Sequence, residues 1–87
     1  MTITTELLNT SNWINATTTQ NFTLGRSDNG VIRVYSNSGT TTVLKDNGGG
    51  TFITYFTVDA GVSKEAVNVF GGNYRITGTD FNYEKAD

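Results

Sequence analysis

Apolar positions are densest along residues 51–58, a run of β-branched and aromatic residues that contains neither Gly nor Pro. Because successive side chains of a β-strand point to opposite faces, Phe52 and Phe56 share one face. Ile53 and Tyr55 share the other face. Bulky apolar groups on both faces predict a strand that is covered on both sides.

Three further strand-like runs precede this one, at residues 17–24, 31–35 and 40–44. Clusters of Gly, Asn, Asp and Ser separate them, and such clusters are typical of turns. The simplest arrangement is a meander in which consecutive strands pair antiparallel through short loops. The sequence therefore predicts that these runs and residues 51–58 form one antiparallel sheet.

The register predicted for this sheet is the one that gathers apolar side chains on a single face. It sets Leu24 opposite Ile32 across a five-residue loop, and Val43 opposite Phe52 across the Gly-rich turn. The first face obtained in this way is the predicted core, made of Phe22, Leu24, Ile32, Val34, Val43, Phe52, Phe56 and Val58.

A second hairpin is predicted around Gly71 and Gly72, because two glycines between apolar runs tolerate the positive φ angles of a type I′ turn. In the expected register Val69 lies opposite Tyr74. The competing interpretation is a short helix that starts with residues 63–66.

The two ends of the chain have a different character. Residues 1–12 contain several Thr, which is a poor helix former, and they predict an extended arm more than a short helix. Residues 13–87 then form a single β domain. Phe81 and Tyr83 precede an acidic C-terminal end that is expected to be mobile.

Composition supports this fold class. The chain has 87 residues with ten Gly and no Pro, and it is rich in Thr and Asn. Thr suits the pleated surface of a sheet, whereas Asn and Gly suit turns. We expect an all-β protein, a small antiparallel β-sandwich or barrel with an extended N-terminal arm. A chain of this size lies near the lower limit for a single hydrophobic core, so self-association is expected.

Residues that carry chemistry are sparse. The chain has no His and no Cys, which excludes a Ser-His catalytic arrangement, thiolate chemistry and a zinc site. The glycines at 48–50 lack the Lys-Ser or Lys-Thr of a phosphate loop, and the Asp-Asn pairs at 28–29 and 46–47 fit turns better than calcium loops. The sequence predicts no enzyme, no cofactor and no metal site.

The net charge of −2 argues against wide contact with nucleic acid or an anionic membrane. There is no apolar run of about 18 residues, and the start of the chain lacks the pattern of a secretory signal. We expect a soluble, unprocessed chain without a membrane partner. One alternative stays open, because Phe52, Tyr55 and Phe56 resemble the base-stacking strand of cold-shock and related barrels, which bind single-stranded nucleic acid.

The second face of the predicted sheet carries large apolar side chains between Arg33 and several Thr. A soluble domain seldom leaves several adjacent groups of this kind in water. Either the C-terminal hairpin folds over them as the second layer of a sandwich, or a neighbouring subunit or partner covers them. The second-face residues predicted as a protein interface are Val31, Tyr35, Leu44, Ile53 and Tyr55.

In size, composition and layout the chain resembles the capsid decoration, or cement, proteins of tailed bacteriophages. The resemblance implies a homo-oligomer, commonly a trimer, on the outer surface of a virion that is made in the host cytoplasm. It further implies that the arm contacts the capsid protein, through Thr2, Ile3, Leu7 and Leu8, and that Tyr35, Ile53 and Tyr55 form a subunit contact. The remaining alternative is a small phage-encoded inhibitor that binds a host protein.

Overall fold

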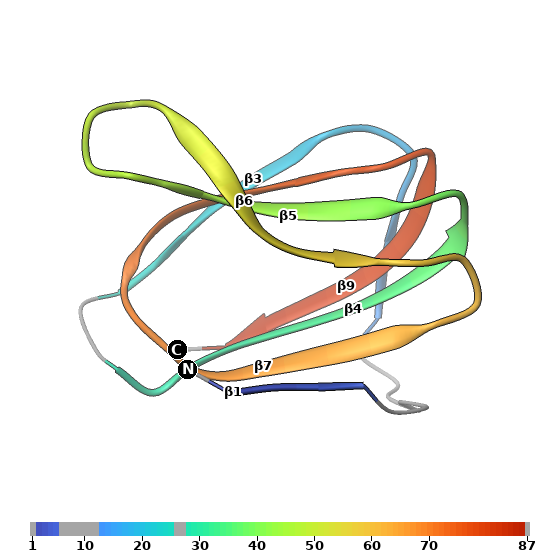
Figure 1. Cartoon of the computed structure of the whole chain (residues 1–87), viewed down its shortest axis with the longest axis horizontal. Helices are drawn as coiled ribbons and strands as arrows, with labels where there is room; N and C mark the ends of the chain where they lie inside the picture. The colour runs from blue at the N-terminus through green and yellow to red at the C-terminus, as the bar shows by residue number, and fades with distance from the viewer. Residues whose placement is uncertain (1, 6–12, 26–27, 87) are drawn as a thin grey trace.

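A computed structural model describes residues 2–5, 13–25 and 28–86, and every regular element among them is a β-strand. The fold is an all-β sandwich of two antiparallel sheets (Figure 1). The strands are β1 (Thr2–Thr5), β2 (Ile14–Ala16), β3 (Gln20–Leu24), β4 (Gly30–Ser38), β5 (Thr41–Asp46), β6 (Phe52–Val58), β7 (Ser63–Val69), β8 (Gly72–Thr77) and β9 (Asp80–Ala86).

One sheet has five strands in the order β1-β7-β4-β9-β2, and the other has four in the order β3-β8-β5-β6. In Figure 1 the four-stranded sheet lies above the five-stranded one. Counting inward from the two ends of the sequence, β2 pairs with β9, β3 with β8, β4 with β7 and β5 with β6. A long double strand has therefore wrapped around a core, which is the topology of a jelly roll.

The core lies between the sheets, and both contribute to it. Its buried apolar residues are Ala16, Leu24, Ile32, Val34, Val43, Phe56, Val58, Ala66, Val69, Tyr74, Ile76, Phe81 and Tyr83. Six of the predicted core residues belong to this set, and Phe22 packs against it while partly exposed. The prediction for Phe52 was wrong, because its ring lies on the outer face of the four-stranded sheet beneath the guanidinium of Arg75, 4.0 Å from Cζ to the ring centroid.

The predicted pairing of consecutive strands was wrong in three places. β3 pairs with β8 and not with β4, so Leu24 lies opposite Gly72. β4 pairs with β7 and β9, whereas β5 belongs to the other sheet. β7 and β8 are also in different sheets, so Val69 lies opposite Gly30 and not opposite Tyr74. The short connections lead from one sheet to the other, a geometry that alternation along a strand does not encode.

The structure also decides two expectations about the C-terminal third of the chain. Residues 63–66 belong to β7, so the alternative of a short helix was wrong. The C-terminal residues 80–86 form β9, an interior strand that pairs with β4 on one side and β2 on the other, so the expectation of a mobile end was wrong for these residues.

The predicted hairpin between β5 and β6 is confirmed, but its register differs. Val43 lies opposite Phe56 instead of Phe52, and Asp46 lies opposite Phe52. The reason is a tight loop: the Asp46 carboxylate oxygen Oδ1 accepts hydrogen bonds from the backbone N–H groups of Gly48, at 2.8 Å, and Gly50, at 2.9 Å. Both glycines have positive φ angles, which a side chain would disfavour.

Candidate interaction surface

A row of side chains crosses the inner side of the four-stranded sheet at one end of the sandwich. Phe22 lies opposite Tyr74, Tyr74 opposite Lys45, and Lys45 opposite Ile53, on the consecutive strands β3, β8, β5 and β6. The connections β5–β6 and β7–β8 lie at this end, on the left of Figure 1. The side chains therefore line the edge of the core where the loops begin.

The ammonium group of Lys45 sits among three aromatic rings. Its Nζ lies 5.9 Å from the ring centroid of Tyr55, 5.7 Å from that of Phe70 and 5.6 Å from that of Tyr74. At these distances the negative faces of aromatic rings attract a cation. We call Lys45, Ile53, Tyr55, Phe70 and Tyr74 the loop-end patch.

Tyr74 fixes the floor of the loop-end patch. Its hydroxyl donates a hydrogen bond to the backbone carbonyl of Phe70, with an oxygen–oxygen distance of 2.5 Å. Burial, and secondly the neighbouring phenol of Tyr55, raise the pKa of Tyr74 above its ordinary value. Tyr74 therefore stays protonated and holds the loop at Phe70 throughout the physiological pH range.

The rim of the patch is apolar and open to solvent. The side chain of Ile53 is 54% exposed and that of Phe70 is 57% exposed. Among the described residues, the ion pairs involve Arg33 and leave Lys45 without a carboxylate partner. Two exposed apolar groups beside an unpaired ammonium can recognise a protein segment that presents an apolar side chain next to a carboxylate.

The loop that carries one side of the patch should respond to acid. Hydrogen bonds from the backbone N–H groups of Gly48 and Gly50 lower the pKa of Asp46, because they favour the carboxylate form. A depressed pKa stabilises the folded loop above the unfolded pKa, and this contribution is lost as the pH falls through the folded pKa. We expect the amide resonances of Gly48 and Gly50 to titrate with Asp46 in an NMR series toward acid pH.

The Asp46→Asn variant is the matched control, since its amide oxygen keeps an acceptor but does not titrate in this range. Glycine resonances that titrate equally in the variant would contradict the assignment to Asp46.

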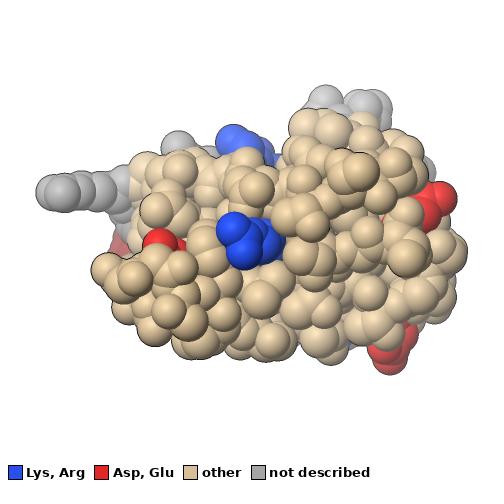
Figure 2. Space-filling view, turned by 90° about the horizontal axis from the view of Figure 1, so that it is seen from above, with Lys and Arg blue, Asp and Glu red and all other residues tan. Residues whose placement is uncertain are grey.

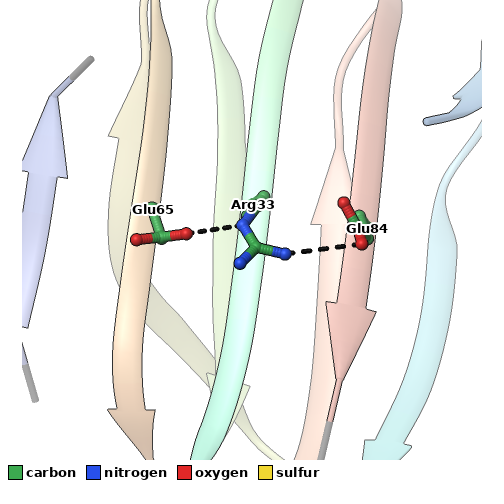
Figure 3. Close-up of polar contacts among 3 residues, drawn as sticks. All are labelled: Arg33, Glu65 and Glu84. Atoms are coloured by element: carbon green, nitrogen blue, oxygen red, sulfur yellow. Dashed lines mark hydrogen bonds and ion pairs between the residues drawn. The ribbon is translucent and has the colours of Figure 1, made fainter. Parts of the chain in front are cut away.

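A separate cluster occupies the outer face of the five-stranded sheet. The Arg33 side chain lies between Glu65 and Glu84, with Nε 2.5 Å from Glu65 Oε2 and Nη1 3.4 Å from Glu84 Oε1 (Figure 3). These three residues come from the adjacent strands β7, β4 and β9. Hydrogen bonding to Glu65 and the charges of both carboxylates raise the pKa of Arg33, so its guanidinium stays charged and links the three strands.

The structure does not bring the predicted second-face residues together. Val31 and Tyr35 flank Arg33 on the outer face of the five-stranded sheet, since Ile32 and Val34 between them are buried. Leu44 lies on the outer face of the other sheet, whereas Ile53 and Tyr55 belong to the loop-end patch. The prediction of one shared face was wrong because β4 and β6 are in different sheets.

The predicted arm is described only in part. Residues 2–5 form β1 and pair with β7, with Thr2 opposite Val67 and Ile3 opposite Ala66. This stretch is extended, as predicted, and it is an edge strand of the five-stranded sheet. Ile3 is 36% exposed. Leu7 and Leu8 lie outside the described residues.

Sequence reasoning missed Lys45, Phe70 and Tyr74 as site residues. The available signal was the position of Phe70 directly before the two glycines at 71–72, since a large aromatic residue at a loop tip is often exposed. The cluster itself depends on pairing between β5, β8 and β6, which the predicted meander did not contain.

The outer face of the four-stranded sheet is mostly uncharged (Figure 2). Arg75 lies there, above Phe52, and its Nε donates a hydrogen bond to Asn21 Oδ1 at 2.8 Å. Phe56 is buried and Tyr55 faces the loop-end patch. The three aromatic residues of β6 therefore do not form one exposed platform on which bases could stack.

Comparison with family models, with curated proteins and with solved structures finds no match to this chain. Within the described ranges, no group of three or more acidic, His or Cys residues is placed to hold a metal ion. The same part of the chain contains no helix of the length and apolarity needed to cross a bilayer.

Proposed function

We propose that the chain is a capsid decoration protein, which binds the outer surface of a bacteriophage shell, self-associates there and stabilises the shell. The observation that carries this proposal is the loop-end patch, where Phe70 is more than half exposed beside Lys45. The patch is a surface for recognition of another protein.

The energetics of the patch support a protein partner. Full burial of a large apolar side chain is worth about 1.5–3 kcal/mol, and Phe70 has more than half of this gain still available. An aromatic residue at the centre of an interface is a common source of binding energy. Lys45 adds selectivity for a carboxylate on the partner.

The fold gives weaker support, by analogy. Jelly-roll sandwiches occur in viral capsid proteins, but also in lectins and cupins, so the topology does not by itself define a function. A decoration protein stabilises its shell because it binds the assembled form in preference to the open one, and the stabilisation grows with its concentration relative to its dissociation constant.

Particles of the encoding virus, assembled with and without this chain, test the proposal. We expect the chain to sediment with mature shells and to raise the temperature at which they rupture. A chain that stays in the supernatant and leaves the rupture temperature unchanged would contradict the proposal. Salt-sensitive binding of labelled single-stranded oligonucleotides would instead favour the nucleic-acid alternative, and specific capture of a host protein by particle-free chain would favour an inhibitor.

A further inference from the structure

The two sheets have four edge strands within the described residues, β1, β2, β3 and β6. Of these, β6 is the least protected against pairing with a strand of another chain. β1 has four residues, β2 three and β3 five, whereas β6 has seven and contains no charged residue, Gly or Pro. Short length, charge and Pro are the usual means by which proteins keep an edge from pairing with another chain. β6 has one such protection, a bulge at Tyr55, which has no residue opposite it on β5.

The β5–β6 ladder shows which backbone groups of β6 are free. The Asn47 N–H donates to the Thr51 carbonyl at 2.9 Å, so these two residues form a hydrogen-bonded pair. Hydrogen-bonded and non-hydrogen-bonded pairs alternate in an antiparallel ladder, which makes Lys45–Ile53 the next bonded pair. The backbone N–H and C=O groups of Phe52 and Thr54 therefore point away from β5, toward the open edge.

We propose that two copies of the chain pair through β6, antiparallel, about a two-fold axis at Ile53. This inference rests on the proposed function, which includes self-association, and it identifies the surface. Phe52 of each copy pairs with Thr54 of the other, which satisfies all the outward backbone groups of this segment. Ile53 then faces Ile53 of the second copy as a non-hydrogen-bonded pair, the closest kind of cross-strand contact.

The exposed side chain of Ile53 fits this arrangement. It is 54% exposed in the single chain, and the two-fold pairing covers it with the same apolar side chain from the second copy. The segment carries no charge, so two identical copies meet without like-charge repulsion. The mostly uncharged outer faces of the two four-stranded sheets become one continuous face (Figure 2).

Pairing of β6 with β6 of a second copy also gives a closed assembly, in which no β6 edge stays free. Pairing of β6 with the opposite edge strand β3 of another copy would leave a free β6 at the end, and repeated addition would form a filament. A two-fold β6 pair uses both free edges at once and stops at a dimer. In the dimer Ile53 faces the second copy, whereas Phe70 and Lys45 of each loop-end patch stay open to the shell, so one dimer can hold two shell subunits and gain avidity.

Analytical ultracentrifugation over a wide range of protein concentration tests the pairing. We expect a reversible monomer–dimer equilibrium. Ile53→Asp should weaken the dimer about tenfold or more, since two carboxylates would meet on the axis. Thr54→Pro should have a similar effect, since it removes an outward N–H from each copy. Ile53→Val and Thr54→Val are the matched controls and should dimerise as the parent chain does.

Hydrogen exchange gives a readout that does not depend on the variants. The amides of Phe52 and Thr54 should become protected as the concentration rises through the dimerisation range. A chain that is monomeric at every concentration would overturn the inference, as would a dimer that tolerates both Ile53→Asp and Thr54→Pro in folded protein. Shell binding by a strictly monomeric chain would support the shell-binding part of the proposed function and overturn both its self-association and this inference. A β6 dimer that does not bind shells would support the inference and contradict the proposed function.

Discussion

Phe81→Ala is expected to destabilise the protein by about 3–5 kcal/mol, enough to unfold much of a small domain whose total stability is about 5–15 kcal/mol. Phe81 is wholly buried near the start of β9, an interior strand of its sheet, and lies opposite Ala16 on β2. Its ring packs against Tyr83, with centroids 6.0 Å apart. The surroundings are tight, since a Cβ added at Gly78 would lie 3.0 Å from Phe81 Cδ1. Truncation would leave a cavity that this core cannot easily fill.

Phe52→Ala is the matched control, because it makes the same chemical change on the outer face of the other sheet. Its main contact is the cation–π pair with Arg75, so we expect a loss of about 1 kcal/mol or less. Urea denaturation of both variants, with the slope of each transition compared with that of the parent chain, measures the difference. Equal losses would contradict the placement of these two rings.

The sequence alone does not determine which face of the sheet a ring occupies, as Phe52 and Phe56 show. The β-branched and aromatic residues of β6 identify a strand, but the bulge at Tyr55 exchanges the faces on its two sides. Phe56 points inward as predicted, whereas Phe52, four residues earlier, points outward. In β9, Phe81 and Tyr83 alternate with polar residues, which is typical of a strand. The acidic residues that follow led instead to the prediction of a mobile end.

The strand content and most of the first core face could be predicted because both depend on local periodicity. The partners of the strands could not, because a jelly roll pairs β2 with β9 and β3 with β8 across most of the chain. Such pairing is selected by packing of two complete sheets, and no turn residue announces it. One of the two alternatives for the cover, a C-terminal hairpin that forms the second layer, holds only for β7, which lies with β9 in the five-stranded sheet, whereas β8 joins β3, β5 and β6 in the other sheet.

The residues of the candidate site likewise divide into those that local sequence predicts and those that strand pairing brings together. Ile53 and Tyr55 were identified as interface residues because two bulky groups on a second face need a cover. Their neighbours Lys45 and Phe70 come from other strands and loops, so their contact with this segment required the β5–β8 and β5–β6 registers. The Arg33 cluster likewise assembles from three strands that are distant in sequence.

Phe70→Asp is expected to weaken binding to shells about a hundredfold, as removal of an interface anchor commonly does. The change removes the most exposed aromatic ring of the loop-end patch. It also places a carboxylate near Lys45, whose Nζ lies 5.7 Å from the centroid of the Phe70 ring. The new carboxylate would pair with the Lys45 ammonium and leave it unavailable to a carboxylate of the shell. Sedimentation of the variant with shells, together with their rupture temperature, measures the effect.

The fold should survive this substitution, because Phe70 is 57% exposed and it is its backbone carbonyl that accepts the hydrogen bond from Tyr74. Ile14→Asp is the matched control: Ile14 is 51% exposed on β2, at the edge of the five-stranded sheet and outside the loop-end patch, and its substitution should leave shell binding intact. Phe70→Leu should retain most of the binding, since it keeps an apolar group beside Lys45. Unchanged binding by Phe70→Asp would remove the loop-end patch as the shell contact, whereas equal losses in Phe70→Asp and Ile14→Asp would show that acidic charge anywhere on the surface opposes binding. The pair therefore separates recognition by one patch from a general electrostatic effect.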